Sequence, residues 1–355
     1  MEEFLEILES NKAYFNYPNI LHTLLINSET QIYYLEELKQ LKTININGEN
    51  TYYQKYIIDY SAINQFEELE MLVITDNQNI QELDISNLQK LHTLVLINNK
   101  NLTTLKGIEN LKELNTVIIV ENKIKTINNF KQFIENTRNT KILKLDVNMY
   151  HYINKSDIIE SENTNIGFAE KISVGQFYNL TLEMMQKLYE KGLEIIEKIN
   201  AKDKYTIALE IYKYLVKTLT YDYENLEIRN QFMLEGNLIS IYQNDYKDIN
   251  SSYKALIEKK AVCEGYANAF KFLTNLREIE AENIVCFLNK TNTRFEYYNH
   301  TASRFRINQE WLYCDSQIED QRELKYFGLT REQFEESHKL PEITKKIGEK
   351  KWNKY

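Results

Sequence analysis

The strongest chemical signal in the chain is a cysteine at the front of a helical pattern. Cys263 precedes apolar residues that recur at helical spacing, namely Tyr266, Phe270 and Leu273. A thiol in the first turn of a helix faces the positive end of the helix dipole, which favours the thiolate that attacks carbonyl carbons. Gly265 in the same turn would let a substrate or a neighbouring strand approach closely. The stretch therefore predicts a nucleophilic cysteine, with Gly265 and Tyr266 as candidate substrate-binding residues.

A base and a group that orients it come from a predicted β-hairpin. Two β-rich runs meet at Asn308 and Gln309. With these as the two turn residues, Ala302 pairs with Asp315. His300 then shares a face with Asp315 and lies diagonally across from it, within reach of an imidazole–carboxylate hydrogen bond. The predicted catalytic set is Cys263 as nucleophile, His300 as base and Asp315 as the residue that orients the base.

The same residues resemble the transglutaminase-like (papain-like thiol) superfamily of bacterial type. The resemblance covers about residues 205–340 and includes Cys263-Glu264-Gly265-Tyr266-Ala267, His300, Trp311, Asp315, Glu319, Asp320, Tyr221-Asp222-Tyr223, Tyr326-Phe327 and His338. It implies a thioester-forming enzyme that acts on amide bonds of a protein or peptide, as a protease, a deamidase or a transglutaminase. Hydrolysis is favoured, because nothing in the sequence suggests a dedicated amine site.

A second hypothesis is a non-catalytic interaction protein whose thiol domain is a degenerate scaffold. Ala302 and Ser303 stand where the family has Trp and Asn after the histidine, which favours this hypothesis. Retention of Cys263, His300 and Asp315 opposes it. Selective alkylation of Cys263 would separate the two hypotheses.

The first half of the chain carries a repeat of the form L-x-x-L-x-L-x-x-N, which resembles a leucine-rich-repeat solenoid. Successive strict copies start 22 and 23 residues apart, at Leu69, Leu91 and Leu114. Looser copies start at Leu21, Leu41 and Thr140, and residues 1–20 are expected to form a cap. Each asparagine at the end of a copy can bond backbone groups in the bend.

The central strand positions of the repeats are expected to line the concave face of this solenoid. They read Val73, Val95 and Ile118 in the middle of the array. An exposed apolar stripe of this kind indicates a surface for a protein partner. Two alternatives stay open: β-branched residues simply favour strands, or the second domain covers the stripe.

The predicted fold class is α+β with an N-terminal repeat solenoid. We assign residues 1–150 to the solenoid, 151–200 to a linker and a helix, and 201–355 to the thiol domain. Helices that precede a small antiparallel sheet give the second domain the order expected of papain-like thiol enzymes.

Composition narrows the class of partner. The 355-residue chain has a net charge of −9, which argues against nucleic acid and anionic membranes. Its three cysteines cannot form an extensive disulfide framework, and the beginning of the sequence lacks the features of a signal peptide, so a cytoplasmic location is expected, with a mature secreted form as the alternative. No cofactor or metal motif is found. The remaining histidines are interpreted as surface residues: His22, His92, His151 and His338.

Overall fold

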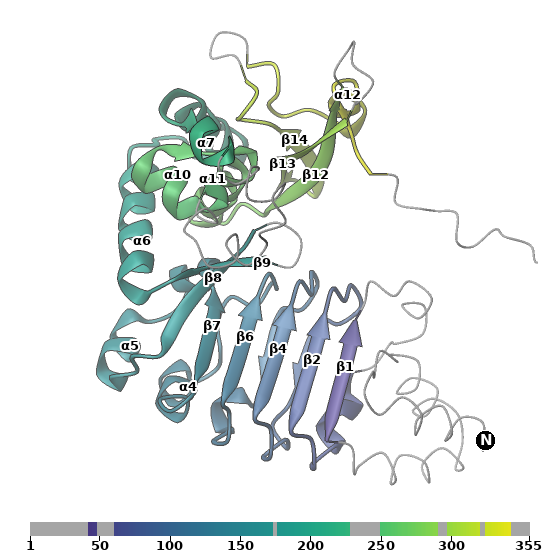
Figure 1. The fold of residues 1–355 in the computed structure, drawn as a ribbon, viewed down its shortest axis with the longest axis vertical. Helices are drawn as coiled ribbons and strands as arrows, with labels where there is room; N and C mark the ends of the chain where they lie inside the picture. Colours follow the sequence, from purple (N-terminus) through teal and green to yellow (C-terminus); the bar gives the residue numbers. More distant parts are fainter. Residues whose placement is uncertain are drawn as a thin grey trace, which may run out of the picture. The chain divides into compact units, whose positions relative to one another are not determined.

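The computed structural model describes residues 42–47, 60–172, 176–227, 249–289, 297–319 and 324–341 (Figure 1). The chain divides into two compact units, one of Met1–Lys171 and Phe177–Met185, the other of Ile172–Gln176 and Gln186–Tyr355. The predicted cap at 1–20 and the loose repeat at Leu21 lie outside the described residues. No helix in the described part is long and apolar enough to cross a membrane.

The first unit is built on a seven-stranded sheet (Figure 1). In spatial order its strands are β1 (Thr43–Asn47), β2 (Met71–Thr75), β4 (Thr93–Ile97), β6 (Thr116–Val120), β7 (Ile142–Asp146), β8 (Ile166–Ile172) and β9 (Gln176–Leu180). The pairs from β1 to β8 are parallel. The register places Leu72 opposite Leu94, which in turn lies opposite Val117. Equivalent positions of successive repeats are therefore neighbours in space.

Alternation along each strand decides which side of this sheet is buried. Leu72, Leu94 and Val117 are completely buried, whereas Val73 and Val95, on the opposite face, are partly exposed. A second, two-stranded parallel sheet lies later in the same repeats and consists of β3 (Glu82–Asp84) and β5 (Thr104–Lys106). Short 3-10 turns follow the same rhythm, at η1 (Ser61–Gln65) and η2 (Ile108–Asn110). The leucines thus form the core that joins neighbouring repeats.

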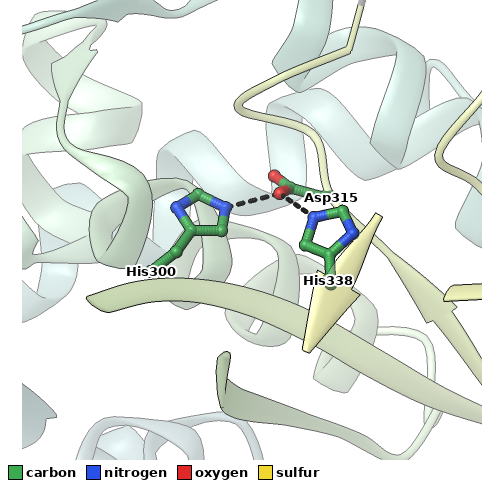
Figure 2. A group of neighbouring side chains, drawn as sticks. All are labelled: His300, Asp315 and His338. Atoms are coloured by element: carbon green, nitrogen blue, oxygen red, sulfur yellow. Dashed lines mark hydrogen bonds and ion pairs between the residues drawn. The ribbon is translucent and has the colours of Figure 1, made fainter. Parts of the chain in front are cut away.

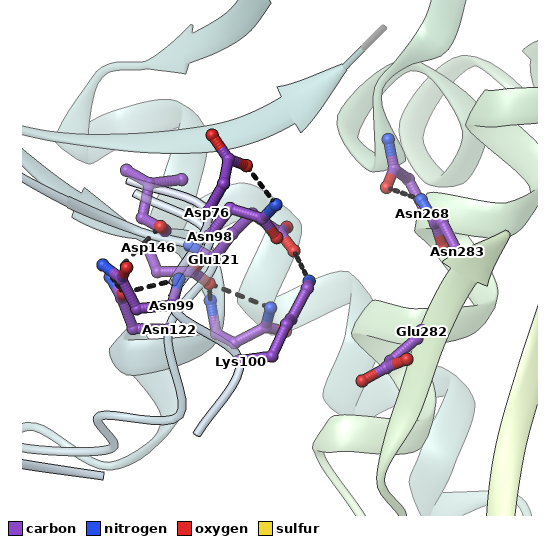
Figure 3. Close-up of polar contacts among 12 residues, drawn as sticks. Asp76, Asn98, Asn99, Lys100, Glu121, Asn122, Asp146, Asn268, Glu282 and Asn283 are labelled. Atoms are coloured by element: carbon purple, nitrogen blue, oxygen red, sulfur yellow. Dashed lines mark hydrogen bonds and ion pairs between the residues drawn. The ribbon is translucent and has the colours of Figure 1, made fainter. Parts of the chain in front are cut away.

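The asparagine that ends each strict repeat links one repeat to the next (Figure 3). Nδ2 of Asn99 donates to the carbonyl of Ile74 at 2.9 Å, and Nδ2 of Asn122 donates to the carbonyl of Leu96 at 2.8 Å. The backbone N–H of Asn77 donates to Oδ1 of Asn99, whose own N–H donates to Oδ1 of Asn122. These bonds satisfy backbone groups that the bend would otherwise leave buried without partners.

Residues 151–200, which the sequence pattern assigns to a linker and a helix, continue the sheet as far as Leu180. After α4 (Phe130–Asn136) and η3 (Val147–His151) come α5 (Lys155–Ser161), β8 and β9. Six of the seven residues of β8 are buried. A strand covered on both faces shows no alternation of polar and apolar residues, so no periodic pattern predicts a strand there.

The second unit combines helices with a four-stranded antiparallel sheet in the order β14-β13-β12-β15. Its elements are α6 (Leu182–Glu197), which leads into it, α7 (Lys204–Thr218), β10 (Thr220–Tyr221), α10 (Ser252–Glu258), β11 (Lys260–Ala261), α11 (Cys263–Asn275), β12 (Ala281–Asn289), β13 (Tyr297–Ile307), β14 (Glu310–Cys314), α12 (Arg331–Glu335) and β15 (His338–Lys339). Helix α11 packs on this sheet through Phe270, whose ring meets Phe305 edge to face at 5.7 Å.

The predicted hairpin is present with the expected register. Ile307 pairs with Glu310, and the two turn residues, Asn308 and Gln309, have φ values of 48° and 72°. Positive φ at both positions is the type I′ geometry that fits the twist of two adjacent strands. The hairpin brings the end of β14 beside the middle of β13, where the candidate site lies.

Candidate functional site

Cys263 is the first residue of helix α11 and is partly exposed. The chain reaches it from β11, which pairs in parallel with β10, and turns at Val262, whose extended backbone ends the strand. The N–H of Val262 is bound to the carbonyl of Ile249 at 3.0 Å. Val262 offers no side-chain cap to the helix. The thiol and the amide groups of the first turn therefore start from a fixed position at the positive end of the helix dipole.

Gly265 serves packing of the chain itself. A methyl group at this position would lie 2.7 Å from the carbonyl oxygen of Ile249 and 2.6 Å from Cβ of Ala261. Approach of a neighbouring segment, one of the two roles that the sequence suggested for Gly265, is thus present in the structure. Its assignment as a substrate-binding residue stays a prediction. Tyr266 is 5% exposed, and burial raises its pKa to about 12, so it too lies within the packed helix.

His300 and Asp315 meet as the hairpin register predicts (Figure 2). His300 lies on β13 opposite Cys286 and is 5% exposed, and Asp315 follows β14 and is 2% exposed. Nε2 of His300 lies 2.5 Å from Oδ2 of Asp315. Oδ1 of Asp315 accepts from the backbone N–H groups of Gln317 and Ile318. The carboxylate is thus held on one side by its own loop and on the other by the imidazole.

Cys263 lies in the neighbourhood of this pair. Its side chain is one of the groups that raise the pKa of His300. Because Nε2 of His300 is engaged with Asp315, Nδ1 is the ring nitrogen left to serve the thiol. The structure therefore pairs His300 with Asp315, as the sequence predicts, and Cys263 raises the pKa of the same imidazole; that the three act as one triad stays a prediction.

Charges within this group reinforce one another. Burial opposes an imidazolium at His300, but the interactions with Asp315 and Cys263 outweigh it and raise the pKa of His300 to about 10. Burial alone would raise the pKa of the Asp315 carboxyl. Hydrogen bonds from His300 and His338 reverse that effect and hold the pKa of Asp315 well below its ordinary range. The stable form of the pair is imidazolium beside carboxylate.

The other two cysteines differ from Cys263. Cys286 is completely enclosed, and Cys314 is 1% exposed. Burial raises the pKa of both thiols, and the charge of Asp315 raises them further. Both are therefore kept as neutral, inaccessible thiols, as expected of cysteines that act as small core residues. Among the three cysteines, only Cys263 combines access with a histidine partner.

His338 belongs to this site, although the sequence analysis predicted that it lies on the surface. It is completely buried, and its Nε2 lies 3.0 Å from Oδ2 of Asp315 (Figure 2). The prediction was wrong because His338 reaches Asp315 through a long-range pairing: β15 adds to the edge of β12, where His338 lies opposite Leu288. Its place in the resemblance to the thiol family was the one signal that could have found it.

Tyr212 and Glu319 anchor the loop that carries Asp315. The Tyr212 hydroxyl lies 2.6 Å from Oε2 of Glu319 and 3.0 Å from the backbone carbonyl of Asp315. Burial, followed by the bond to Glu319, raises the pKa of Tyr212, so its hydroxyl stays protonated and donates. Glu319 also accepts from the N–H groups of Lys325 and Tyr326. The backbone of Asp315 is therefore tied to helix α7 as well as to the sheet.

His300, Asp315 and His338 could in principle offer three ligand atoms to a metal ion, since those atoms lie within 4.8 Å of one another. The spacing does not fit such a role. Both nitrogens approach the same oxygen at 2.5 and 3.0 Å, which are hydrogen-bond lengths. Ligands on a tetrahedral ion with bonds of about 2.1 Å would lie roughly 3.4 Å apart. The arrangement is one of shared protons.

Val73, Val95 and Ile118 form one row across the sheet of the first unit. The register aligns them on β2, β4 and β6, and each is partly exposed. The row continues to Lys144 on β7. These residues belong to the first compact unit.

Comparison with known proteins identifies a family model that matches the part of the chain containing this site. Residues 190–343 match the family model of a transglutaminase-like domain. A comparison with curated proteins finds no match. Similar solved structures include a candidate cysteine protease from Cytophaga hutchinsonii, with 17% identity, a TM-score of 0.27, and coverage of 38% of this chain and 37% of that one. A TGase is 13% identical, with a TM-score of 0.30 and coverage of 50% of each chain.

This chain spans no more than half of the length of either solved structure. Similarities at these TM-scores do not bear on mechanism, so the assignment depends on the family match. That match includes every residue from Cys263 to His338 in the site described above. The chain thus has a mixed α+β fold and carries, at residues 190–343, a transglutaminase-like domain.

Proposed function

We propose that this domain catalyses acyl transfer at amide bonds of a protein or peptide. Cys263 acts as nucleophile, His300 as proton acceptor and donor, and Asp315 as the residue that orients His300. The observation that supports this most strongly is the buried bond between Nε2 of His300 and Oδ2 of Asp315, together with the effect of Cys263 on the pKa of the same imidazole. A nucleophile, a base and an orienting acid in one row are what covalent acyl transfer requires.

The reaction proceeds in two halves. The sulfur of Cys263 attacks the carbonyl carbon, a C–S bond forms, and the C–N bond breaks as His300 gives its proton to the leaving nitrogen. The product of this half is a thioester and a free amine or ammonia. Water then attacks the thioester while His300 takes its proton, and the C–S bond breaks to release a carboxylic acid. A primary amine in place of water would give a new amide.

Charge that develops on the carbonyl oxygen needs hydrogen-bond donors. The backbone N–H of Cys263 supplies one in this proposal, because it lies in the first turn of α11 and Val262 contributes no side-chain cap. The helix dipole adds a positive potential at the same point. Gly265 supports this geometry indirectly, since its missing side chain lets the segment at Ile249 approach the helix start.

The first unit would recruit the substrate. We propose that it is a leucine-rich-repeat solenoid that covers residues 1–150 and binds a protein through Val73, Val95 and Ile118. Support comes from the repeat spacing, the parallel register and the asparagine ladder. Replacement of Val95 by Lys is expected to reduce turnover of a protein substrate at least tenfold while leaving alkylation of Cys263 unchanged. An equal effect on both would contradict a recruiting role.

Mass spectrometry of a test protein tests the proposal. The full-length chain is incubated with unfolded casein, with and without a primary amine, beside a Cys263→Ala control. Conversion of an amide to an acid, a cleavage, or incorporation of the amine identifies a deamidase, a protease or a transglutaminase respectively. The same products from Cys263→Ala would overturn the proposal. Absence of any product, together with slow alkylation of Cys263, would favour the non-catalytic scaffold.

A further inference from the structure

Asp315 accepts four hydrogen bonds, two at each oxygen of its carboxylate. Oδ1 receives the two backbone N–H groups of its own loop, from Gln317 and Ile318. Oδ2 receives two imidazoles, Nε2 of His300 and Nε2 of His338 (Figure 2). A buried carboxylate needs partners for all its acceptor sites, and four bonds account for them. The imidazole of His338 is therefore one of the donors that satisfy the buried carboxylate of Asp315.

The ring of His338 has a fixed position. It stacks on Phe334 with centroids 4.0 Å apart and an interplanar angle of 13°, and the edge of Tyr326 approaches it at 5.7 Å. Phe334 lies in α12, which begins with a capping box between Thr330 and Gln333. The backbone of His338 is paired with β12. The imidazole consequently cannot swing away from Asp315 without disturbing the packing of α12.

Asp315 decides which nitrogen of His338 carries the proton. A carboxylate only accepts hydrogen bonds, so Nε2 of His338 must donate to Asp315. In a neutral ring, Nδ1 is then an acceptor, and the Ser337 hydroxyl lies 2.8 Å from it. In this tautomer the Ser337 hydroxyl can donate to Nδ1, in competition with the carbonyl of Phe334, which lies 3.4 Å from the same hydroxyl. Two imidazoles, a carboxylate and a hydroxyl thus form one connected chain.

We propose that His338 is a positioning residue of the acyl-transfer site, which holds Oδ2 of Asp315 toward His300 and shares that oxygen with it. This inference rests on the proposed function. An oxygen that accepts two donors is a weaker partner for each than an oxygen that serves one. His338 therefore moderates how tightly His300 keeps its proton, which matters because His300 must release that proton to the leaving nitrogen.

Other ionisable groups around the pair would respond in the same experiment. In the described part of the chain they include Cys263 of α11, Cys286 of β12, Cys314 of β14, Tyr212 of α7, and Glu319 and Tyr326 of the loop that follows β14. Of these, Cys263 is the thiol that raises the pKa of His300. The test therefore uses Cys263→Ala as its background, which removes the contribution of the thiol and leaves the two imidazoles on Asp315.

The measurement is the pH midpoint at which the ring signal of His300 titrates. The full-length chain with Cys263→Ala is labelled with ¹³C-histidine; its five histidines give few signals, and His300→Gln identifies the one of interest. His338→Phe keeps a ring against Phe334 but removes the donor. We expect it to raise the midpoint of His300 by about one pH unit, since hydrogen bonds to charged groups act on this scale.

His338→Gln is the matched control, because its Nε2 can still donate to Asp315. We expect its midpoint to stay close to that of the reference chain. An unchanged or lowered midpoint in His338→Phe would overturn the inference. If His338→Phe does not fold, as judged by circular dichroism, Ser337→Ala decides instead: it should raise the midpoint by a smaller amount, and no change would overturn the inference.

The two proposals can fail separately. Cys263 in the wild-type chain could be alkylated slowly while His300 still responds to His338→Phe as predicted. That result would overturn the proposed enzymatic function and support the role of His338. Fast alkylation with no response of His300 would overturn the role of His338 alone.

Discussion

Oδ2 of Asp315 lies 2.5 Å from Nε2 of His300, although the two residues are fifteen positions apart in the chain. A two-residue turn at Asn308 and Gln309 brings them together by folding β14 back along β13. Both side chains are almost completely buried. The imidazolium–carboxylate pair is therefore a product of hairpin register, and any slip in that register would separate it.

Replacement of Asp315 by Asn should disable the site. Asn keeps the shape of the side chain but not its charge, so the pKa of His300 should fall and the imidazole should lose its fixed orientation. We expect the turnover of an identified substrate to fall by about 10²- to 10⁴-fold, the range seen when the orienting acid or the base of such a triad is removed. Steady-state kinetics measure this.

Glu282→Gln is the control for Asp315→Asn. It removes a carboxylate from a partly buried ion pair with Arg304 on the same sheet. Its turnover should remain within about threefold of wild type, since partly exposed ion pairs contribute little. Equal losses in the two variants would show that the effect of Asp315 is one of general stability.

Stability should depend on pH through His300 and Asp315 in opposite directions. The pKa of His300 is raised to about 10, so its contribution is complete below its unfolded value near 6.5 and disappears as the pH rises toward 10. The pKa of Asp315 is lowered, so its contribution is complete above its unfolded value of about 4 and is lost in stronger acid. Thermal unfolding midpoints from pH 3 to 10 measure both effects.

Variants assign each limb of that curve. His300→Gln should flatten the decline between about pH 6.5 and 10, and Asp315→Asn should flatten the decline below about pH 4. Curves that keep the wild-type slope in both variants would show that other groups control the pH dependence.

Gly265→Ala should destabilise the second unit. Its new methyl group would lie 2.7 Å from the carbonyl oxygen of Ile249, a backbone atom that cannot move aside cheaply. We expect a loss of about 1–3 kcal/mol in the free energy of unfolding, as for other overpacked sites. Gly192→Ala is the comparison, because its methyl group meets the movable side chains of Leu276 and Phe272. Urea unfolding should show the larger loss for Gly265→Ala.

Asn99→Ala should weaken the first unit. Its buried side chain serves the N–H of Asn77 and the carbonyl of Ile74, and both would lose their partner. Each unsatisfied buried group costs about 1–3 kcal/mol, so we expect a loss of about 2–4 kcal/mol in the free energy of unfolding. Asn87→Ala, at an exposed position, should change stability by less than about 0.5 kcal/mol. Similar losses in both would contradict the ladder.

Local sequence patterns predicted those features of the site that depend on residues a few positions apart. Cys263 was visible from helical spacing, and His300 and Asp315 from alternation around a two-residue turn, because these rules act over a few residues. His338 was missed because only the pairing of β15 with β12 brings it to Asp315. Strand β8 was missed because burial on both faces removes alternation. Both failures come from long-range packing, which no window of sequence contains.

The most direct test of the central claim, that Cys263 and His300 act as a pair, is the rate at which iodoacetamide modifies each cysteine at pH 6. Mass spectrometry of peptides from the full-length chain gives the three rates separately. We expect Cys263 to be modified far faster than Cys286 or Cys314. In His300→Gln, this difference in modification rate should disappear. Equal, slow modification of all three, or a fast reaction at Cys263 that persists in His300→Gln, would contradict the central claim.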